Sequence, residues 1–182
     1  VKEFAIENIS GTISSEMQRN AIVSVIIATI LMLIYIAVRF DDVKFGAAAV
    51  VALLHDVLVV FAIYSIGRLS VGNTFIACML TIVGYSINAT IIIFDRIREN
   101  LVLMKSKGES YENIVNASIS QTFTRTIYSS LTTFVMVFVL YIMGVTSIKE
   151  FALPIIVGIV CGAYSSLFVA PTFWAMWKKS TK

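Results

Sequence analysis

Charged residues are scarce in this chain of 182 residues: they make up 14% of it, whereas 58% of the residues are hydrophobic. A soluble domain carries roughly 25% charged residues, so this chain lacks the polar surface that would cover a water-soluble core. The mean hydropathy is +0.90 and the net charge only +3, with the basic residues in short clusters beside apolar runs. This pattern suits membrane orientation better than nucleic-acid binding. We therefore expect a protein of the lipid bilayer with no nucleic-acid partner.

Cysteine is nearly absent as well. Cys78 and Cys161 both lie inside long apolar runs without metal-ligand spacing, which favours small hydrophobic side chains over a disulfide or a metal site. We expect neither a metal nor a cofactor. The chain also begins without Met and without the charged start of a signal peptide, so we expect that a preceding segment is missing.

Long apolar runs are what the sequence has instead. A spanning helix needs about 20 apolar residues at ~1.5 Å of rise each. We predict an all-α membrane protein with five transmembrane helices, at about residues 20–38, 45–67, 69–94, 122–146 and 151–177. Residues 1–19 would be the tail of an extracytoplasmic segment, and residues 20–182 the transmembrane domain.

The polar connection 95–121 is longer than the other connections. It has an amphipathic first part, a stop at Gly108 and a new start at Ser110. We predict two short interfacial helices that lie along the cytoplasmic surface of the membrane.

Basic residues predict the direction of the helices. With the C-terminus in the cytoplasm, ten of the 14 Lys and Arg residues lie on or near the cytoplasmic side, as the positive-inside rule requires. Trp174 and Trp177 beside Lys178 and Lys179 would form an interfacial anchor at the same end. The N-terminal stretch then lies outside.

Small residues indicate where the helices pack. Lipid is as apolar as leucine, so helices in a bilayer associate through close backbone approach or polar contacts. Gly158, Gly162 and Ser166 recur at four-residue spacing on the fifth predicted helix. We predict that they form a packing face.

Two polar residues interrupt the second predicted helix near the bilayer midplane, His55 and Asp56. A charged group at this depth costs roughly 2.5–3.5 kcal/mol on insertion scales, so it is a functional candidate. Neighbouring residues on a helix point ~100° apart, so the two side chains cannot share one partner directly. Two interpretations stay open: an ion relay, or hydrogen bonds that only fix the helix contacts.

A polar stripe marks one face of the fourth predicted helix, at spacings i, i+3, i+4, i+7 and i+11: Thr122, Arg125, Thr126, Ser129 and Thr133. Such a stripe cannot face lipid cheaply, so we expect it to line the bundle interior or a hydrated path. Arg125 alone could reach the cytoplasmic headgroups, but the stripe continues inward for two turns.

The third predicted helix has a weaker matching face, which Asn88 and Ala89 extend toward the cytoplasm. Position 89 lies at a depth similar to that of Arg125. We expect an arginine that faces this helix to have an acid across from it, and the sequence shows none there.

Three segments together resemble one family. They are ALLHDV at Ala52–Val57, GYSINATIIIFDRIREN at Gly84–Asn100 and SISQTFTRTIYSS at Ser118–Ser130. These motifs, their spacing and the five-helix layout resemble the SecF half of the bacterial SecD–SecF protein-export membrane component. The His-Asp pair points to SecF rather than to the related SecD half, and the resemblance covers essentially the whole chain.

The resemblance implies the fold and the function. It implies the membrane half of an RND-superfamily transporter in the bacterial inner membrane, with one further helix and a periplasmic domain ahead of Val1. It also implies work with the SecD half, fused or separate, the SecYEG translocon, the SecA motor and unfolded preprotein. The driving force would be a gradient of H⁺, or of Na⁺ in some relatives, and the subunit would not be an enzyme.

The resemblance also assigns residues. Arg125 matches the family's intramembrane arginine, and Asp56 matches its HD aspartate. The cytoplasmic run DRIREN is matched by Asp95, Arg96, Arg98 and Glu99, with their neighbours.

The departure is at position 89, where the family pattern has an aspartate and this chain has Ala89. That aspartate is the group expected to bind and release the coupling ion, so we expect impaired coupling. The substitution is either engineered or natural, and in the second case coupling runs elsewhere. Two other functions stay open: half of an RND-type drug or lipid exporter, and a scaffold subunit without transport.

Overall fold

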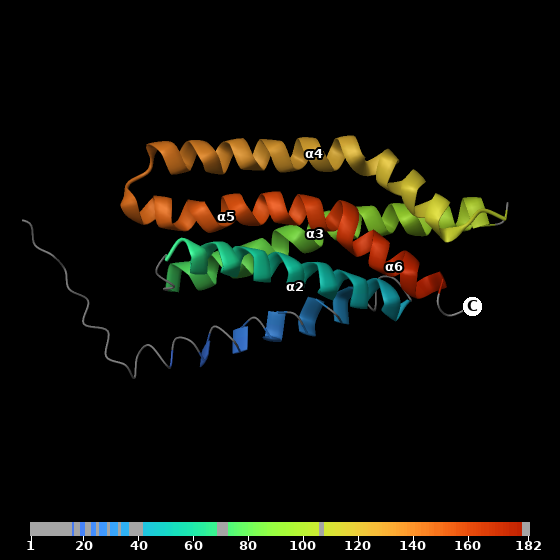
Figure 1. The fold of residues 1–182 in the computed structure, drawn as a ribbon, viewed down its shortest axis with the longest axis horizontal. Helices are drawn as coiled ribbons and strands as arrows, with labels where there is room; N and C mark the ends of the chain where they lie inside the picture. Colours follow the sequence, from blue (N-terminus) through green and yellow to red (C-terminus); the bar gives the residue numbers. More distant parts are fainter. Residues whose placement is uncertain are drawn as a thin grey trace, which may run out of the picture.

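The computed structural model describes residues 42–68, 73–105 and 108–179, together with scattered positions between 16 and 36. The elements in the three continuous ranges are α2 (Val43–Ile66), α3 (Asn73–Lys105), α4 (Tyr111–Met143), α5 (Thr146–Tyr164), the π-helix η1 (Ser165–Val169) and α6 (Ala170–Lys179). These ranges contain no strand. Figure 1 shows the long helices side by side, with α5, η1 and α6 as one bent path.

Four helices among the described residues are long and apolar enough to cross a membrane: Val43–Ile66, Thr74–Lys105, Tyr111–Met143 and Ile148–Lys179. They correspond to four of the five predicted spans. The predicted first span, 20–38, is described only at scattered positions, and these are helical. The all-helical membrane architecture is therefore present, and the first span, 20–38, stays a prediction.

The prediction of two separate surface helices between residues 95 and 121 is wrong in its boundaries. α3 continues without a break to Lys105, and α4 already begins at Tyr111. The turn between them passes through Gly108, whose φ of +81° favours glycine. The polar residues of this segment do not end the helices, because they pair across α3 and α4 as described below.

The last helical path also differs from the prediction. Residues 147–150, between the predicted spans 122–146 and 151–177, belong to α5, and the chain turns instead at Gly144 and Val145. Pro154 therefore lies inside α5, where it cannot donate to the carbonyl of Glu150 four residues earlier. The hydroxyl of Tyr64 on α2 donates to that carbonyl at 3.4 Å. The side chain of another helix thus replaces the backbone bond that proline removes.

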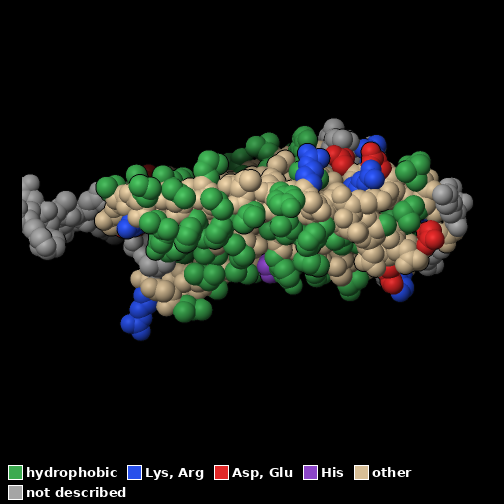
Figure 2. Space-filling view, turned by 90° about the horizontal axis from the view of Figure 1, so that it is seen from above, with side chains coloured by type: hydrophobic (Ala, Val, Ile, Leu, Met, Phe, Trp, Pro, Cys, Tyr) green, Lys and Arg blue, Asp and Glu red, His purple; other side chains and the backbone are tan. Residues whose placement is uncertain are grey.

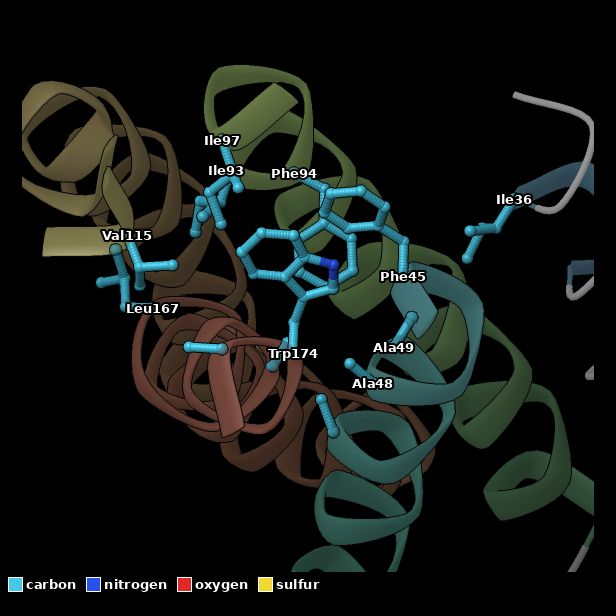
Figure 3. Close-up of a cluster of buried hydrophobic side chains, with 13 residues drawn as sticks. Ile36, Phe45, Ala48, Ala49, Ile93, Phe94, Ile97, Val115, Leu167 and Trp174 are labelled. Carbon is cyan, nitrogen blue, oxygen red and sulfur yellow. The ribbon is translucent and has the colours of Figure 1, made fainter. Parts of the chain in front are cut away.

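The largest hydrophobic cluster lies where α2, α3 and α6 meet (Figure 3). The indole of Trp174 stacks on Phe45, with ring centroids 4.8 Å apart, and Phe45 in turn contacts Phe94. Trp174 is fully buried, so its prediction as an interfacial anchor is wrong, whereas Trp177 is exposed. Trp174 packs inward because alanines 48, 49 and 52 leave room on the facing side of α2.

Small residues set the distance between α3 and α5. A Cβ added at Gly158 would lie 2.4 Å from the Ile82 side chain, and one added at Gly162 would lie 3.3 Å from Cβ of Ser86. Ser166 is buried and donates to a carbonyl of its own helical path. The predicted small-residue face therefore lies against α3 at its two glycines, and it brings Ser86 close to α5.

Ion pairs join the helices at one end of the bundle. Lys178 pairs with Asp42 at 2.6 Å, and Lys179 pairs with Glu112 at 2.8 Å. Partial burial raises the pKa of the Asp42 carboxyl, but the hydrogen bond and charge of Lys178, with the Lys44 backbone N–H, outweigh it and hold the pKa below its usual value. Figure 2 shows charged side chains gathered toward this end and hydrophobic ones over the middle of the bundle.

Candidate functional site

Asp56 lies midway along α2 and is only 1% exposed. Its Oδ2 accepts hydrogen bonds from the hydroxyls of Ser86 on α3, at 2.5 Å, and Ser165 on η1, at 2.7 Å. Its Oδ1 lies 3.1 Å from Nδ1 of His55. One carboxylate therefore joins three helical elements, and we call these four residues the Asp56 cluster.

The local fold explains why these groups meet. Gly162 allows α5 to approach Ser86 of α3, and Ser165 follows where the path changes to the π-helix η1. A π-helix adds a residue to the turn and shifts the direction of the side chains; such segments are frequent at functional sites. The shift gives both Ser165 and the next residue, Ser166, buried positions.

His55 occupies the border between the Asp56 cluster and the surface. Its side chain is 35% exposed, and its ring lies 6.0 Å from the ring of Tyr164 on α5. Figure 2 shows the histidine at the surface among hydrophobic side chains, and the chain contains one histidine. The neighbours His55 and Asp56 contact each other, and the two serines are partners of Asp56.

The electrostatic setting of Asp56 is unusual for a buried acid. Among the described residues, His55 is the only basic side chain within ion-pair distance of it. A buried charge is costly unless hydrogen bonds or a counter-charge compensate it. Two hydroxyls and one imidazole can serve a charged carboxylate, and they can equally serve a neutral acid whose proton faces the imidazole. The cluster is thus chemically able to hold a proton.

The structure does not bring the other predicted relay residues to Asp56. Asn88 and Arg125 are exposed, on α3 and α4 respectively, and Ala89 is buried. Position 89 follows Ser86 by three residues, so it lies about one helical turn from the Asp56 cluster. The relay residues that the sequence predicts are therefore divided between a buried cluster around Asp56 and exposed positions at Asn88 and Arg125.

The predicted polar stripe on α4 is divided in the same way. Thr122 and Thr126 are buried, whereas Ser129 is exposed and Thr133 is half-buried. The Thr133 hydroxyl donates to the backbone carbonyl of Ser129. The buried polar row runs straight along α4 at four-residue spacing: Ser118, Thr122, Thr126 and Ser130. Within this row the hydroxyl of Ser130 accepts from Tyr85 of α3 at 3.1 Å, and the Thr126 hydroxyl has no hydrogen-bond partner.

The DRIREN motif lies where the ends of α3 and α4 run together. The Asn100 side chain is buried and donates to Ser118 at 2.8 Å and to Gln121 at 2.9 Å. Arg96 donates to Gln121 at 2.6 Å and pairs with Glu99. Of the other motif residues, Asp95 is half-buried and Arg98 exposed. These contacts explain the extended α3–α4 pair.

Ser86 and Ser165 are the two site residues that the sequence analysis missed. Both lie within the segments that suggested function or packing: Ser86 is two residues before Asn88, and Ser165 directly precedes Ser166. A serine in an apolar run is a weak signal by itself. The useful signal was Asp56 itself, because a buried carboxylate requires donors from neighbouring helices.

Comparison with known proteins gives a consistent set of relatives. The family model described as protein export membrane protein SecD/SecF, C-terminal, matches residues 1–180. Protein translocase subunit SecDF of Bacillus subtilis is 44% identical over 174 residues, which are 95% of this chain and 24% of that protein. Protein translocase subunit SecF of Alicyclobacillus acidocaldarius is 39% identical over 178 residues, 97% of this chain and 58% of that protein.

Solved structures give the same relationship. The crystal structure of SecDF from Thermus thermophilus, described as a translocon-associated membrane protein, matches with a TM-score of 0.86 and 43% identity. The match covers 93% of this chain and 23% of that one. The chain thus spans 58% or less of the length of these relatives.

Proposed function

The chain belongs to the family of SecD/SecF protein-export membrane proteins, and from this premise we propose that it is the SecF-like membrane part of a subunit that uses a proton gradient in late steps of preprotein translocation. Its relatives are translocase subunits and do not form a known family of catalytic enzymes. The whole assembly would include the SecYEG translocon, SecA and the unfolded preprotein. Its place would be the bacterial inner membrane, with the charged end of the bundle in the cytoplasm and the N-terminal stretch outside.

The outward polar surface of α3 and α4 supports a SecD partner. Asn88, Arg125 and Ser129 are exposed on helices that are long enough to span a membrane. Polar groups at membrane depth are rarely left facing lipid, so a second set of helices would cover them. SecDF relatives carry SecD and SecF in one chain, which makes the SecD half the natural cover.

Asp56 is the observation that carries the coupling proposal. It is an almost fully buried acid in the middle of a spanning helix, and it binds helices α2, α3 and η1 together through its hydrogen bonds. A change between the charged and the neutral carboxyl would change the strength of each of these bonds. Proton uptake at Asp56 would thereby alter the packing of α5 and η1 against α2 and α3.

A proton suits the cluster better than Na⁺. One of the two carboxylate oxygens faces a ring nitrogen, and the other already accepts from two hydroxyls. An imidazole is a proton carrier near neutral pH, whereas hard cations prefer oxygen ligands.

Ala89 makes the relay that the resemblance implies incomplete. We propose that coupling at this position is impaired and that Asp56, about one turn of α3 away through Ser86, carries what coupling the protein has. This assigns Arg125 to the SecD-facing surface rather than to the coupling carboxyl.

The experiment compares variants of the full-length protein, assembled with SecD and the translocon in inverted membrane vesicles. The measured quantity is the fraction of preprotein transport that a protonophore abolishes. Asp56→Asn should lose that fraction, because the amide resembles a carboxyl in shape but does not titrate. Asp42→Asn, a matched change outside the spanning segments, should retain it, and Ala89→Asp should increase it.

Retention of the full gradient-dependent fraction by Asp56→Asn would contradict the coupling proposal. If no variant changes transport while Gly158→Leu prevents assembly with SecD, the protein acts as a scaffold. Co-purification with an outer-membrane channel instead of the translocon would favour the drug or lipid exporter.

A further inference from the structure

The Asp56 cluster has one exposed member, and this member defines a path to the carboxyl. We propose that His55 is the group through which protons reach Asp56, with their access on the face between α2 and α5 beside Tyr164. This inference rests on the proposed function, because it assumes that Asp56 takes up a proton, and it names the residue that delivers it.

Burial of the other members closes the remaining routes. Ser86 and Ser165, the two partners of Oδ2, are 1% and 0% exposed. His55, the partner of Oδ1, has a side chain that is 35% exposed. Among the described hydrogen-bond partners of Asp56, His55 is therefore the one through which the carboxyl is connected to the surface.

The transfer balances within the pair. In the resting state, Nδ1–H of neutral His55 donates to the Asp56 carboxylate. An incoming proton binds to Nε2, and the imidazolium then gives its Nδ1 proton to Oδ1: the N–H bond breaks and the O–H bond forms. His55 ends as the neutral tautomer that carries its hydrogen on Nε2, and Asp56 ends as the neutral acid that donates to Nδ1. One proton has entered, and no other reactant is required.

Among the described residues, His55 is the titratable side chain within hydrogen-bond distance of Asp56. On α5, Cys161 and Tyr164 are the titratable side chains near the pair, and the Tyr164 ring lies beside His55. The contacts that α3 and η1 make with Asp56 are serine hydroxyls, which do not titrate in this range. Neither Cys161 nor Tyr164 is among the described hydrogen-bond partners of Asp56, whereas Nδ1 of His55 lies 3.1 Å from its Oδ1.

The geometry at His55 also fits a gate rather than a packing residue. The surface around His55 is hydrophobic, and a polar side chain at membrane depth faces a protein partner or a hydrated path rather than lipid. Tyr164, which is 54% exposed, presents an aromatic ring next to the imidazole. The imidazole is therefore a polar group within an apolar surface, and it contacts the buried carboxyl of Asp56.

The test measures how fast Asp56 becomes protonated after a jump in pH, in full-length protein reconstituted with SecD in liposomes. The infrared band of a protonated carboxyl that is missing in Asp56→Asn identifies the group. His55→Gln preserves size and hydrogen bonding but cannot carry a proton. We expect it to slow protonation by about a hundredfold, the lower end of the effect of a positioned proton carrier. Added imidazole should restore the rate.

The control is Ser166→Ala, a buried change in η1 at a hydroxyl that donates to the Ala163 carbonyl and not to Asp56. It should leave the rate unchanged. Protonation of His55→Gln at the wild-type rate, or a slow rate that imidazole does not restore, would overturn the inference.

A measurement on the unaltered protein covers the case in which His55→Gln does not fold. Nitrogen NMR of labelled histidine reports which ring nitrogen carries the hydrogen. We expect the hydrogen of His55 to move from Nδ1 to Nε2 as Asp56 is protonated; a tautomer that does not change would overturn the inference. A different result would contradict the proposed function, namely gradient-dependent transport that is retained in Asp56→Asn.

Discussion

Replacing Gly158 by alanine tests how closely α5 approaches α3. The added Cβ would lie 2.4, 2.6 and 2.7 Å from three atoms of the Ile82 side chain. Carbon atoms pack at about 3.5–4.0 Å, so the two helices must separate or Ile82 must move by about 1 Å. Overpacking of this kind costs about 1–3 kcal/mol, and it works against a gain of about 1 kcal/mol in helix propensity.

Gly84 provides the matched control, because a Cβ added there meets nothing within 4 Å. Gly84→Ala should show the propensity gain alone. The unfolding free energies of Gly158→Ala and Gly84→Ala should therefore differ by about 1–3 kcal/mol, as measured by reversible denaturation of the full-length protein in mixed micelles. Gly162→Ala should fall between them, since its nearest contact is 3.3 Å.

The double variant decides whether Ile82 is the cause. Ile82→Ala removes all three clashing atoms and by itself costs about 2–5 kcal/mol through the cavity. In that background Gly158→Ala should become stabilising, because only the propensity gain remains. Equal destabilisation by Gly158→Ala with and without Ile82 would refute the proposed approach of the helices.

Two further predictions concern contacts at the ends of the helices. Tyr64→Phe should lower the unfolding free energy by about 0.5–1.5 kcal/mol, and by less in Pro154→Ala, whose N–H can bond to the Glu150 carbonyl; an equal loss in both backgrounds would contradict this. The lowered pKa of Asp42 in the folded state means that its pairing with Lys178 stabilises above the unfolded pKa and is lost as the pH falls through the folded one. As the pH falls below about 5, thermal stability should therefore decline more steeply in the wild-type protein than in Asp42→Asn; parallel curves would argue against it.

Hydropathy predicted the apolar parts of α2 to α6, because a helix that crosses the bilayer requires a long run of apolar residues. It did not predict the ends of α3 and α4. Asn100 and Gln121 are polar, so the sequence alone suggested a surface segment, yet they bond to each other and extend the helices. Hydropathy registers polarity, but it does not register which polar groups are satisfied by a partner.

The sequence identified the central residue of the site, Asp56, but not the side chains that donate hydrogen bonds to it. Asp56 is visible because a carboxylate in an apolar run is costly. Its contacts with Ser86 and Ser165 join residues 30 and 109 positions apart, and the second depends on a π-helix that no spacing rule indicated. Arg125 faces outward because packing against neighbouring helices sets the rotation of a helix; the i, i+3, i+4 pattern identifies a face but not its direction.

The central claim is that Asp56 takes up a proton inside the bundle. Infrared difference spectra of the full-length protein in lipid, recorded as the pH is lowered, test it most directly. We predict a protonated-carboxyl band that grows as the pH falls, that is absent in Asp56→Asn and that persists in Asp42→Asn. Identical carboxyl bands in the wild-type protein and Asp56→Asn over the whole titration would contradict the claim.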